Sequence, residues 1–590
     1  MKIDAAATGR PEQGTAPSGG SAAHAVASVG AISQRKLRSN FPRGSYLWSV
    51  RNAQWQALGL REEDCEKPKI AVVNSSSELA SCYSHLDKVA AEVKQAIRDA
   101  GAIPFEIRTA APSDFITGAG ARGAYMLGAR DLVTNDIEVA VEGAQLDGMV
   151  CLTSCDKTVP GQLMAAARLN IPTIVVPCGY QASGEYKGHH CDIEEVFIGA
   201  MHVVTGAMDV DTVVGMSREA IRSPGVCSGM GTANSMHIVC EALGMALPGS
   251  APVAAMSPKM MADVRAAGKR IVEMVWADLK PRDILTPGAF GNAVRAVLAV
   301  GGSVNCVKHL QAVVTEADSK VDIYDLFEKF AASTPVIAGV RPVGDHTIEA
   351  FEAAGGARGL LKQLEPLLDT QALSVSGRTL GEELNDFQPR DMQTIRAMNQ
   401  PFAKLPAIVV LRGNLCPDTG IVKTGIIARK SRRFTGKAIC YDTSDAAVAA
   451  IKSGEIQPGH VVVMRGAGAK GGPAMGGGAS RVVFALDGAG LGDSVALLTD
   501  GHLSGLVCKG LVVAEISPEA AIGGPLALVA DGDSITIDLD LRLCDLQISD
   551  AEMARRRAAW TPPTPLFDTG WLQIYRRNVG ATATGAVLVK

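Results

Sequence analysis

The sequence predicts an α/β fold: an N-terminal domain with a parallel sheet, followed by a β-barrel-like domain flanked by helices. Three observations support this prediction. Short apolar runs alternate with helical periodicity in the first part, the middle is mostly helical, and the last third carries short β-rich runs between glycine-rich turns. Strands that alternate with helices form helix-covered parallel sheets, whereas closely spaced strands and turns favour a barrel or sandwich.

The strands predicted for the first domain are short apolar runs, most of them separated by helical patterns. The runs are 70–73, 103–108, 148–153 and 172–177, and the helical stretches include 86–100 and 161–169. In a parallel sheet, ligands bind at the carboxyl ends of the strands. We therefore expect the chemistry in the loops that follow Val73, Thr153 and Pro177.

Beyond a mostly helical stretch over 251–384, the polar and proline-punctuated stretch 386–406 is typical of a domain boundary. The strands expected after it are 407–411, 438–441, 460–464, 494–498 and 534–537, with a helix over 552–560. We predict four parts along the chain: a flexible arm (1–40), an α/β domain with the metal centres (41–395), a barrel-like domain with the catalytic serine (396–565), and a tail packing back on the first domain (566–590).

Composition excludes several classes of protein. The 590 residues include 57 Lys and Arg against 61 Asp and Glu, a formal net charge of −4, which argues against nucleic acid or an anionic membrane as the main partner. The apolar runs are shorter than the roughly 18–20 residues that a membrane span needs. The first residues show neither the apolar stretch of a secretory signal nor an arginine-rich pattern, so we expect a cytoplasmic protein.

The 13 cysteines form an odd number in a long chain without repeats, which does not look like a disulfide framework. Either most of them are buried small hydrophobes, or a few bind metal. Cys82 and Cys155 each follow a predicted strand, and Cys227 lies in a glycine-containing loop. Thiolates from three loops can converge on one iron–sulfur cluster and leave an iron position open, although packing alone also explains cysteines at such positions.

Charged side chains stand beside the second of these cysteines, in the run Cys155-Asp156-Lys157, and Asp114 follows another predicted strand. Carboxylates at strand ends can hold Mg²⁺, but a solvated loop or a helix N-cap would also explain them. Ser504 lies in a glycine-flanked turn, D-G-H-L-S-G, after an apolar strand. A serine near a metal can act as a base, although turn chemistry alone also selects Asp, Gly and Ser.

Two further motifs carry weaker signals. The glycine-rich stretch 466–478 lacks the GxxxxGK[ST] pattern, so we do not interpret it as a nucleotide-binding loop. The run His189-His190-Cys191 contains metal-ligand residue types, but its flanking glycine favours a surface loop. Cys508, close to Ser504, receives no role.

Together these segments resemble the dihydroxy-acid and sugar-acid dehydratases, a family that includes 6-phosphogluconate dehydratase. The most specific runs are C-D-K-x-x-P-G at 155–161 and D-G-x-x-S-G at 500–505. The other matching runs follow the family's order: 74–86, 113–138, 225–244, 411–418, 470–473 and 516–521.

The resemblance implies an Mg²⁺-dependent iron–sulfur hydro-lyase that forms a homodimer or homotetramer. The implied ligands of a 2Fe–2S cluster, or less readily a 4Fe–4S cluster, are Cys82, Cys155 and Cys227. The implied ligands of Mg²⁺ are Asp114, Asp156 and Lys157, the lysine being carbamylated and so converted to an oxygen ligand. Ser504 takes the role of general base that removes the C2 proton of a small hydroxy-acid substrate. Position alone suggests that Thr158 and His502 contact this substrate.

The chain departs from the family pattern at two acidic positions. Ala121 stands where relatives often carry the acidic residue of G-H-E-G-M, and Gly477 stands at the acidic position of G-G-P-G-M-x-E. From these changes we expect a sugar acid, or a broad range of small polyhydroxy acids, converted to the 2-keto-3-deoxy acid. One alternative is the branched-chain dihydroxy acid of amino-acid biosynthesis. An alternative of another class is a non-catalytic iron–sulfur protein of the same fold.

Overall fold

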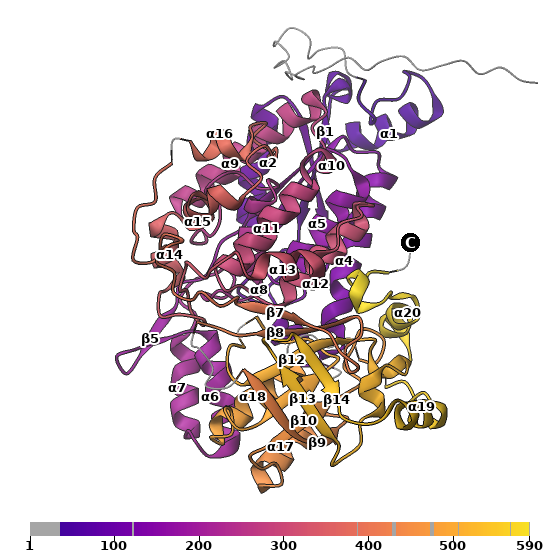
Figure 1. Ribbon diagram of the computed structural model, residues 1–590. Helices are drawn as coiled ribbons and strands as arrows, with labels where there is room; N and C mark the ends of the chain where they lie inside the picture. Colours follow the sequence, from indigo (N-terminus) through magenta and orange to yellow (C-terminus); the bar gives the residue numbers. More distant parts are fainter. Residues whose placement is uncertain are drawn as a thin grey trace, which may run out of the picture. The chain divides into compact units, whose positions relative to one another are not determined.

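The computed structural model of the protein describes residues 36–120, 123–385, 387–426, 432–472, 477–505, 507–566 and 568–588. The arm predicted over 1–40 therefore lies almost entirely outside the described residues and stays a prediction, as do the domain limits. Leu37–Lys590 forms a compact unit. This unit holds a parallel sheet and a barrel-like sheet, which confirms the predicted fold class (Figure 1).

The first sheet has four parallel strands in the order β2-β1-β3-β4. Their bounds are β1 (Lys69–Asn74), β2 (Ile103–Arg108), β3 (Gly148–Thr153) and β4 (Thr173–Pro177). Every residue of β1, β3 and β4 is buried. Burial on both faces explains why these strands are mostly continuous apolar runs rather than alternating patterns.

The helices next to this sheet bury one apolar stripe each. In α2 (Leu86–Asp99) the buried residues include Leu86, Val89, Val93 and Ile97, at the spacing of one helical face. This face packs against α9 (Pro258–Ala277), where a Cβ at Gly268 would lie 2.7 Å from Ala96 Cβ. The glycine therefore lets the two helices approach closely. A second helix pair, α4 (Tyr125–Gly143) and α5 (Thr158–Leu169), also packs on the sheet.

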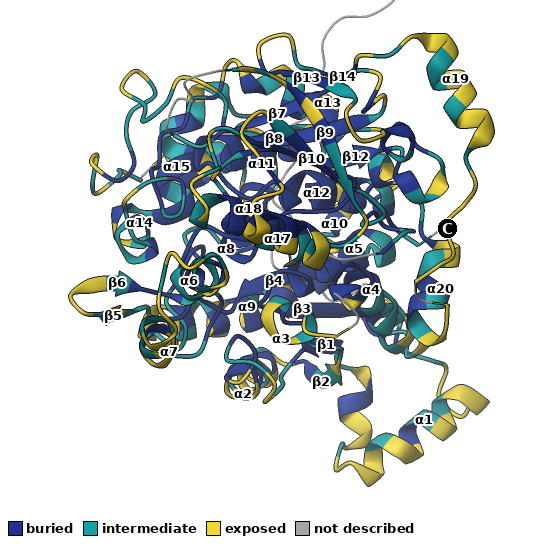
Figure 2. Cartoon of the chain, turned by 90° about the horizontal axis from the view of Figure 1, so that it is seen from below, coloured by how far each residue is buried: buried dark blue, intermediate teal, exposed yellow. Residues whose placement is uncertain are grey.

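Helices fill most of the stretch 251–384, as the sequence predicts, and further helices that it did not predict precede this stretch. Those not yet named are α1 (Tyr46–Ala57), α3 (Asp114–Thr117), α6 (Ile193–Thr205), α7 (Val210–Glu219), α8 (Thr232–Ala242), α10 (Pro281–Ile284), α11 (Pro287–Ala299), α12 (Asn305–Glu316), α13 (Ile323–Ala331), α14 (Ile348–Ala354), α15 (Gly356–Leu364) and α16 (Leu380–Leu384). Figure 2 shows that α8, α11 and α12 are largely buried, whereas α1 is largely exposed.

The second sheet has eight strands in the order β14-β13-β9-β10-β11-β12-β8-β7. Their bounds are β7 (Ile408–Leu411), β8 (Thr419–Lys423), β9 (Arg433–Tyr441), β10 (His460–Met464), β11 (Ala496–Thr499), β12 (Leu511–Ser517), β13 (Ser534–Asp538) and β14 (Leu543–Leu546). The strands from β9 to β12 pair in parallel, and the outer pairs are antiparallel. Arg412, just after β7, bridges Leu543 of β14, so the two edges meet and the sheet nearly closes.

Both faces of the second sheet are buried. Along β10, Val461 and Val463 belong to the apolar cluster inside the barrel, whereas Val462 and Met464 belong to the large cluster that also contains the first sheet. Helices α17 (Ser444–Ser453) and α18 (Gly477–Gly488) connect the parallel strands β9, β10 and β11. Strands β8, β12 and β14 are not among the strands predicted from the sequence.

The C-terminal segment ends with α19 (Asp550–Ala559) and α20 (Gly570–Asn578), and α20 packs on α4. A Cβ at Gly128 of α4 would lie 3.0 Å from the ring of Tyr575 and 3.1 Å from Trp571 Nε1, so the absence of a side chain allows this close contact. No helix among the described residues is both long and apolar enough to cross a membrane.

The barrel seam depends on a glycine. Gly413 has φ +134°, and a Cβ there would collide with the carbonyl oxygen of Cys544. Gly454, which ends α17 with φ +77°, has nothing within 4 Å of such a Cβ. We expect Gly454→Ala to lower the free energy of unfolding by about 1–2 kcal/mol through backbone conformation alone. Gly413→Ala should cost about 3 kcal/mol or more, because the collision adds to the backbone strain. Equal losses in urea unfolding would show that the seam tolerates a side chain.

Candidate active site

A cavity of about 740 Å³ lies at the carboxyl ends of the first sheet's strands and is closed by residues from the second sheet's loops and helices. The turn after β1 contributes Cys82, and Asp114 begins α3 after β2. Cys155 follows β3 directly, and Gln181 lies in the segment after β4. The parallel sheet thus places residues distant in sequence around one space, as expected for ligand sites at strand ends.

Six of the nine predicted site residues line this cavity: Cys82, Asp114, Cys155, Asp156, Cys227 and Ser504. Lys157 does not line the cavity itself but contacts Asp114 and Asp156 from the side facing away from it. Thr158 begins α5, where its Oγ1 donates to Cys155 O at 2.9 Å, and His502 is buried against Lys308. Neither Thr158 nor His502 lines the cavity, so the substrate contacts predicted for them find no support in these positions.

Two of the three thiols influence each other. Interaction between Cys82 and Cys155 is the largest cause of both shifts: it raises the pKa of Cys82 well above its ordinary value and lowers the pKa of Cys155. Burial raises the pKa of Cys227 well above its ordinary value. Metal binding at such thiols must release protons, since the thiolate is the ligand. All thirteen cysteines lie among the described residues and are free thiols.

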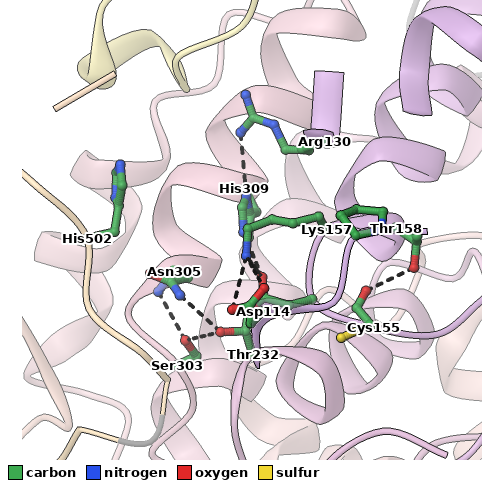
Figure 3. A network of polar contacts seen from close by, with 12 residues as sticks. Asp114, Arg130, Cys155, Lys157, Thr158, Thr232, Ser303, Asn305, His309 and His502 are labelled. Atoms are coloured by element: carbon green, nitrogen blue, oxygen red, sulfur yellow. Dashed lines mark hydrogen bonds and ion pairs between the residues drawn. The ribbon is translucent and has the colours of Figure 1, made fainter. Parts of the chain in front are cut away.

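Lys157 lies behind the cavity wall between the carboxylates of Asp114 and Asp156, and Figure 3 shows its contact with Asp114. Its side chain is fully buried, and its Nζ donates to Asp156 Oδ1 at 2.6 Å and to Asp114 Oδ1 at 3.0 Å. Although burial opposes the charge, the two carboxylates together raise the pKa of Lys157. Burial and the neighbouring Asp156 raise the pKa of Asp114. The pKa of Asp156 is lowered, because Lys157 and His309 outweigh its burial.

A second layer of buried polar residues supports these carboxylates. His309, on α12, places Nε2 3.6 Å from Asp156 Oδ1, and Arg130 Nη1 lies 3.5 Å from His309 Nδ1 (Figure 3). Arg130 also donates to Asp131 at 3.0 Å and to the carbonyl oxygen of Ala586 at 2.6 Å. The carboxylate site is therefore linked to the C-terminal segment.

The turn that carries Ser504 packs against the amino end of α8. A Cβ at Gly505 would lie 2.6 Å from both Ser303 Oγ and Thr232 N, so only glycine fits here. Thr232 Oγ1 lies 2.9 Å from Ser303 Oγ and accepts a hydrogen bond from Asn305 Nδ2 at 3.1 Å (Figure 3). On the other side, the backbone N–H of Ser504 donates to Ser480 Oγ at 2.9 Å.

The acidic residues of two sequence runs hold the glycine-rich loop. Asp500 accepts hydrogen bonds from the backbone N–H groups of Ala467 at 2.9 Å and Ala520 at 2.9 Å. Glu519 accepts from Lys470 N and Gly471 N, and burial raises the pKa of Glu519 to about 7. Asp500, the first residue of D-G-x-x-S-G, is thus a structural residue. Of the two departures in sequence, Ala121 lies outside the described residues, and Gly477 begins α18 without a carboxylate.

Among the described residues, one set of three metal-ligand side chains brings its ligand atoms within 4.8 Å of one another: His190, Asp192 and Glu195. This region forms the hairpin of β5 (Gly184–Tyr186) and β6 (His189–Cys191) rather than the expected irregular loop. Asp192 caps α6 by accepting from Glu194 N and Glu195 N, and Glu195 pairs with Arg341. These carboxylates already have partners, so we do not interpret the set as a metal site.

Sequence reasoning missed several buried residues near the cavity. Lys308, His309 and Glu515 lie within a helix or a strand and belong to no motif with a known spacing, and Arg130 lies in the matching run 113–138 without being singled out there. A charged residue inside a helical pattern usually faces solvent, so nothing in the sequence marked these four as buried.

Comparison with known proteins gives matches along almost the whole chain. Residues 67–383 match the family model described as dihydroxy-acid/6-phosphogluconate dehydratase N-terminal, and residues 393–586 match the corresponding C-terminal model. Relatives named dihydroxy-acid dehydratase occur in Hydrogenobaculum sp. (strain Y04AAS1), Aquifex aeolicus (strain VF5) and Acetivibrio thermocellus. They are 38%, 37% and 38% identical to the chain, and each match covers 94% of it and 100% of the relative.

A buried histidine, His237, contacts the turn before Cys155, and its titration should make the stability of the protein depend on pH. His237 is fully buried, with Nε2 3.1 Å from Ser154 O, and burial lowers its pKa to about 4. In the unfolded chain this imidazole binds a proton near pH 6.5, so its contribution to stability is complete above that pH and is lost as the pH falls toward 4.

Between pH 7.5 and pH 5, His237 should account for about 2 kcal/mol of the fall in the unfolding free energy of the metal-free protein. Urea unfolding of His237→Gln should show a pH dependence smaller by that amount. His189→Gln, at an exposed position, is the matched control and should keep the original dependence. An unchanged pH dependence in His237→Gln would contradict the neutral state of the buried imidazole.

Proposed function

Since the chain belongs to the dihydroxy-acid/6-phosphogluconate dehydratase family, we propose that it is a hydro-lyase acting on a branched 2,3-dihydroxy carboxylic acid. The reaction removes water and gives the corresponding 2-keto acid. One observation carries the proposal: a single cavity holds thiols, carboxylates and a serine beside a wall of apolar side chains. In a hydroxy acid with an alkyl substituent, the polar groups match the polar part of this cavity and the alkyl group matches its apolar wall.

The apolar wall supports one of the two substrate classes. Phe115 and Phe197 line the cavity, and their rings stack edge to face with centroids 5.7 Å apart. Ile116, Ile193 and Ile221 also line it. A sugar acid would bring hydroxyl groups against these side chains without hydrogen-bond partners, which is unfavourable. Together with the relatives named dihydroxy-acid dehydratase, this wall favours the branched-chain acid over the sugar acid expected from the sequence.

The cysteines suit an iron–sulfur cluster because they are buried or half-buried thiols around one cavity and two of them interact closely enough to shift each other's pKa. We propose Cys82, Cys155 and Cys227 as ligands of a 2Fe–2S cluster. The oxygen-rich donor set suits Mg²⁺, with Asp114, Asp156 and Lys157 as ligands once the lysine is carbamylated. When bound, these metals supply Lewis acidity toward the substrate's oxygen atoms.

The chain's own residues bind the acid and move its proton. The amino end of α8, with Thr232 and Asn234 in the cavity wall, favours a carboxylate through its N–H groups and dipole. Gln181 also lines the cavity, and its buried Nε2 has no hydrogen-bond partner among the described residues, so it is available to a substrate oxygen. Ser504 Oγ takes the proton from C2 as general base.

A specific observation also supports a second class, a non-catalytic iron–sulfur protein: the sequence lacks the family's acidic residues at Ala121 and Gly477. One experiment distinguishes the hydro-lyase from the non-catalytic protein. The protein is purified anaerobically, reconstituted with iron and sulfide, supplied with Mg²⁺, and assayed for 2-keto acid formation. The substrates compared are branched 2,3-dihydroxy acids, sugar acids and glycerate. Because each buried CH₂ is worth about 0.8 kcal/mol, an alkyl branch should raise kcat/KM by about fourfold per carbon. A fully loaded cluster without turnover on any substrate would favour the non-catalytic protein.

The role of the serine is tested by Ser504→Ala. Loss of a general base should lower kcat by about 10²–10⁴-fold, while binding of the 2-keto acid product, measured by calorimetry, should change little. Ser494→Ala, in the turn before β11, is the control and should retain activity. Full activity of Ser504→Ala would exclude the serine as base.

The cluster ligands are tested by colour. In Cys227→Ser, the reconstituted protein should lose most of its visible absorbance, because a hydroxyl replaces a thiolate ligand. Cys440→Ser is the matched control, since Cys440 is also a half-buried thiol but lies on β9. Unchanged absorbance and iron content in Cys227→Ser would refute its role as a ligand.

A further inference from the structure

Three fully buried ionisable side chains form a separate cluster near the Ser504 turn: Lys308, His502 and Glu515. Lys308 Nζ contacts both ring nitrogens of His502, Nδ1 being the nearer and Nε2 lying at 2.6 Å, and it lies 3.3 Å from Glu515 Oε1. His502 Nδ1 lies 2.9 Å from the same Glu515 oxygen. We call these residues the buried triad. None of them lines the cavity.

We propose that the buried triad positions the Ser504 turn by holding it against α12. Lys308 belongs to α12, His502 precedes Ser504 by two residues, and Glu515 lies on β12. The triad therefore joins a helix of the first half to the turn and strand of the barrel. This inference rests on the proposed function, because it takes Ser504 as the base.

The backbone at Glu515 supports a specific requirement for its side chain. Glu515 has φ +54°, although it is not glycine and lies within a strand. The pairing of β12 with β8 shifts register between Ala514 and Ser517, so the strand is irregular here. Glu515 N donates to Gly501 O at 2.9 Å. A left-handed conformation is unfavourable for a residue with a side chain, and here it accompanies a carboxylate directed to Lys308 and His502.

Stability does not explain the buried triad. Burial lowers the pKa of Lys308 to about 8 and raises the pKa of Glu515, so the surroundings disfavour both charges. Glu515 Oε2 is buried and has no hydrogen-bond partner among the described residues. Apolar residues of similar size often fill such a space with equal or better stability. What the triad provides instead is a directional contact across two parts of the fold.

The helix that carries Lys308 contacts both sides of the site. Its first residue, Asn305, donates to Thr232 Oγ1 in the cavity wall, and His309 faces Asp156. Gly505 packs directly on Ser303, two residues before α12 begins. A turn released from α12 would move Ser504 relative to Asp156 as well as to Thr232. An error of about 1 Å in such a placement can cost about 100-fold in rate.

The test compares Lys308→Met with Glu316→Gln in the full-length protein. Glu316 is a matched control, because it is a buried charge on the same helix, paired with Arg168 at 2.8 Å. Hydrogen exchange of the amides in 500–505 requires no cofactor or substrate, and in Lys308→Met it should be at least about 10-fold faster than in the control. With the loaded enzyme, kcat should fall by about 10–100-fold, whereas KM should stay within about threefold.

Glu515→Gln is the second variant, because it keeps the shape of the side chain and removes its charge. It should show the same faster exchange at 500–505 and the same fall in kcat. If Lys308→Met does not fold, Glu515→Gln alone tests the inference. Exchange at 500–505 equal to that of Glu316→Gln in the folded variants would overturn the inference. If the wild-type protein turns over no substrate, the proposed function fails, but the exchange measurement still tests whether the triad holds the turn.

Discussion

The contact of Lys157 with Asp114 and Asp156 fixes how the strand ends around the cavity lie relative to one another. The lysine side chain has no exposed surface, and a buried charge without a partner costs several kcal/mol. Asp114 follows β2 whereas Lys157 follows β3, so these contacts require the two strand ends to remain in register. The parallel sheet supplies that register. The buried side chains of His309 and Arg130 then link the carboxylates to the C-terminal segment.

The barrel contributes to the site because its outer face is part of the same apolar core as the first sheet. Strand β10 alternates its side chains between the interior of the barrel and this shared core, so the two sheets share one packed interior. Gly505 then meets Ser303 and Thr232 at distances that leave no room for a side chain. The serine is placed by packing on both sides of its turn rather than by the turn alone.

The sequence predicted the parallel sheet well because three of its four strands, β1, β3 and β4, are fully buried and stand out as apolar runs. The rule that ligands bind at strand ends directed attention to the loops after Val73 and Thr153, whose Cys82 and Cys155 line the cavity. The sequence did not predict β14, because its run Leu-Cys-Asp-Leu is only four residues long and shows little alternation of apolar and polar residues. Nor could it pair Lys308 with Glu515, which are 207 positions apart and belong to no motif. Contacts of that kind depend on tertiary packing, which a single sequence does not record.

Charge balance distinguishes Lys157 from Lys308, two of the buried lysines. Lys157 faces two carboxylates, which leaves one net negative charge, and a carbamate at the lysine would make all three groups anionic. Such a set favours a divalent cation. Lys308 faces only the carboxylate of Glu515 together with His502, so with a neutral imidazole the triad has no net charge and gains nothing from a cation. The Lys157 set therefore suits the divalent cation proposed for it, whereas the charges of the buried triad balance without one.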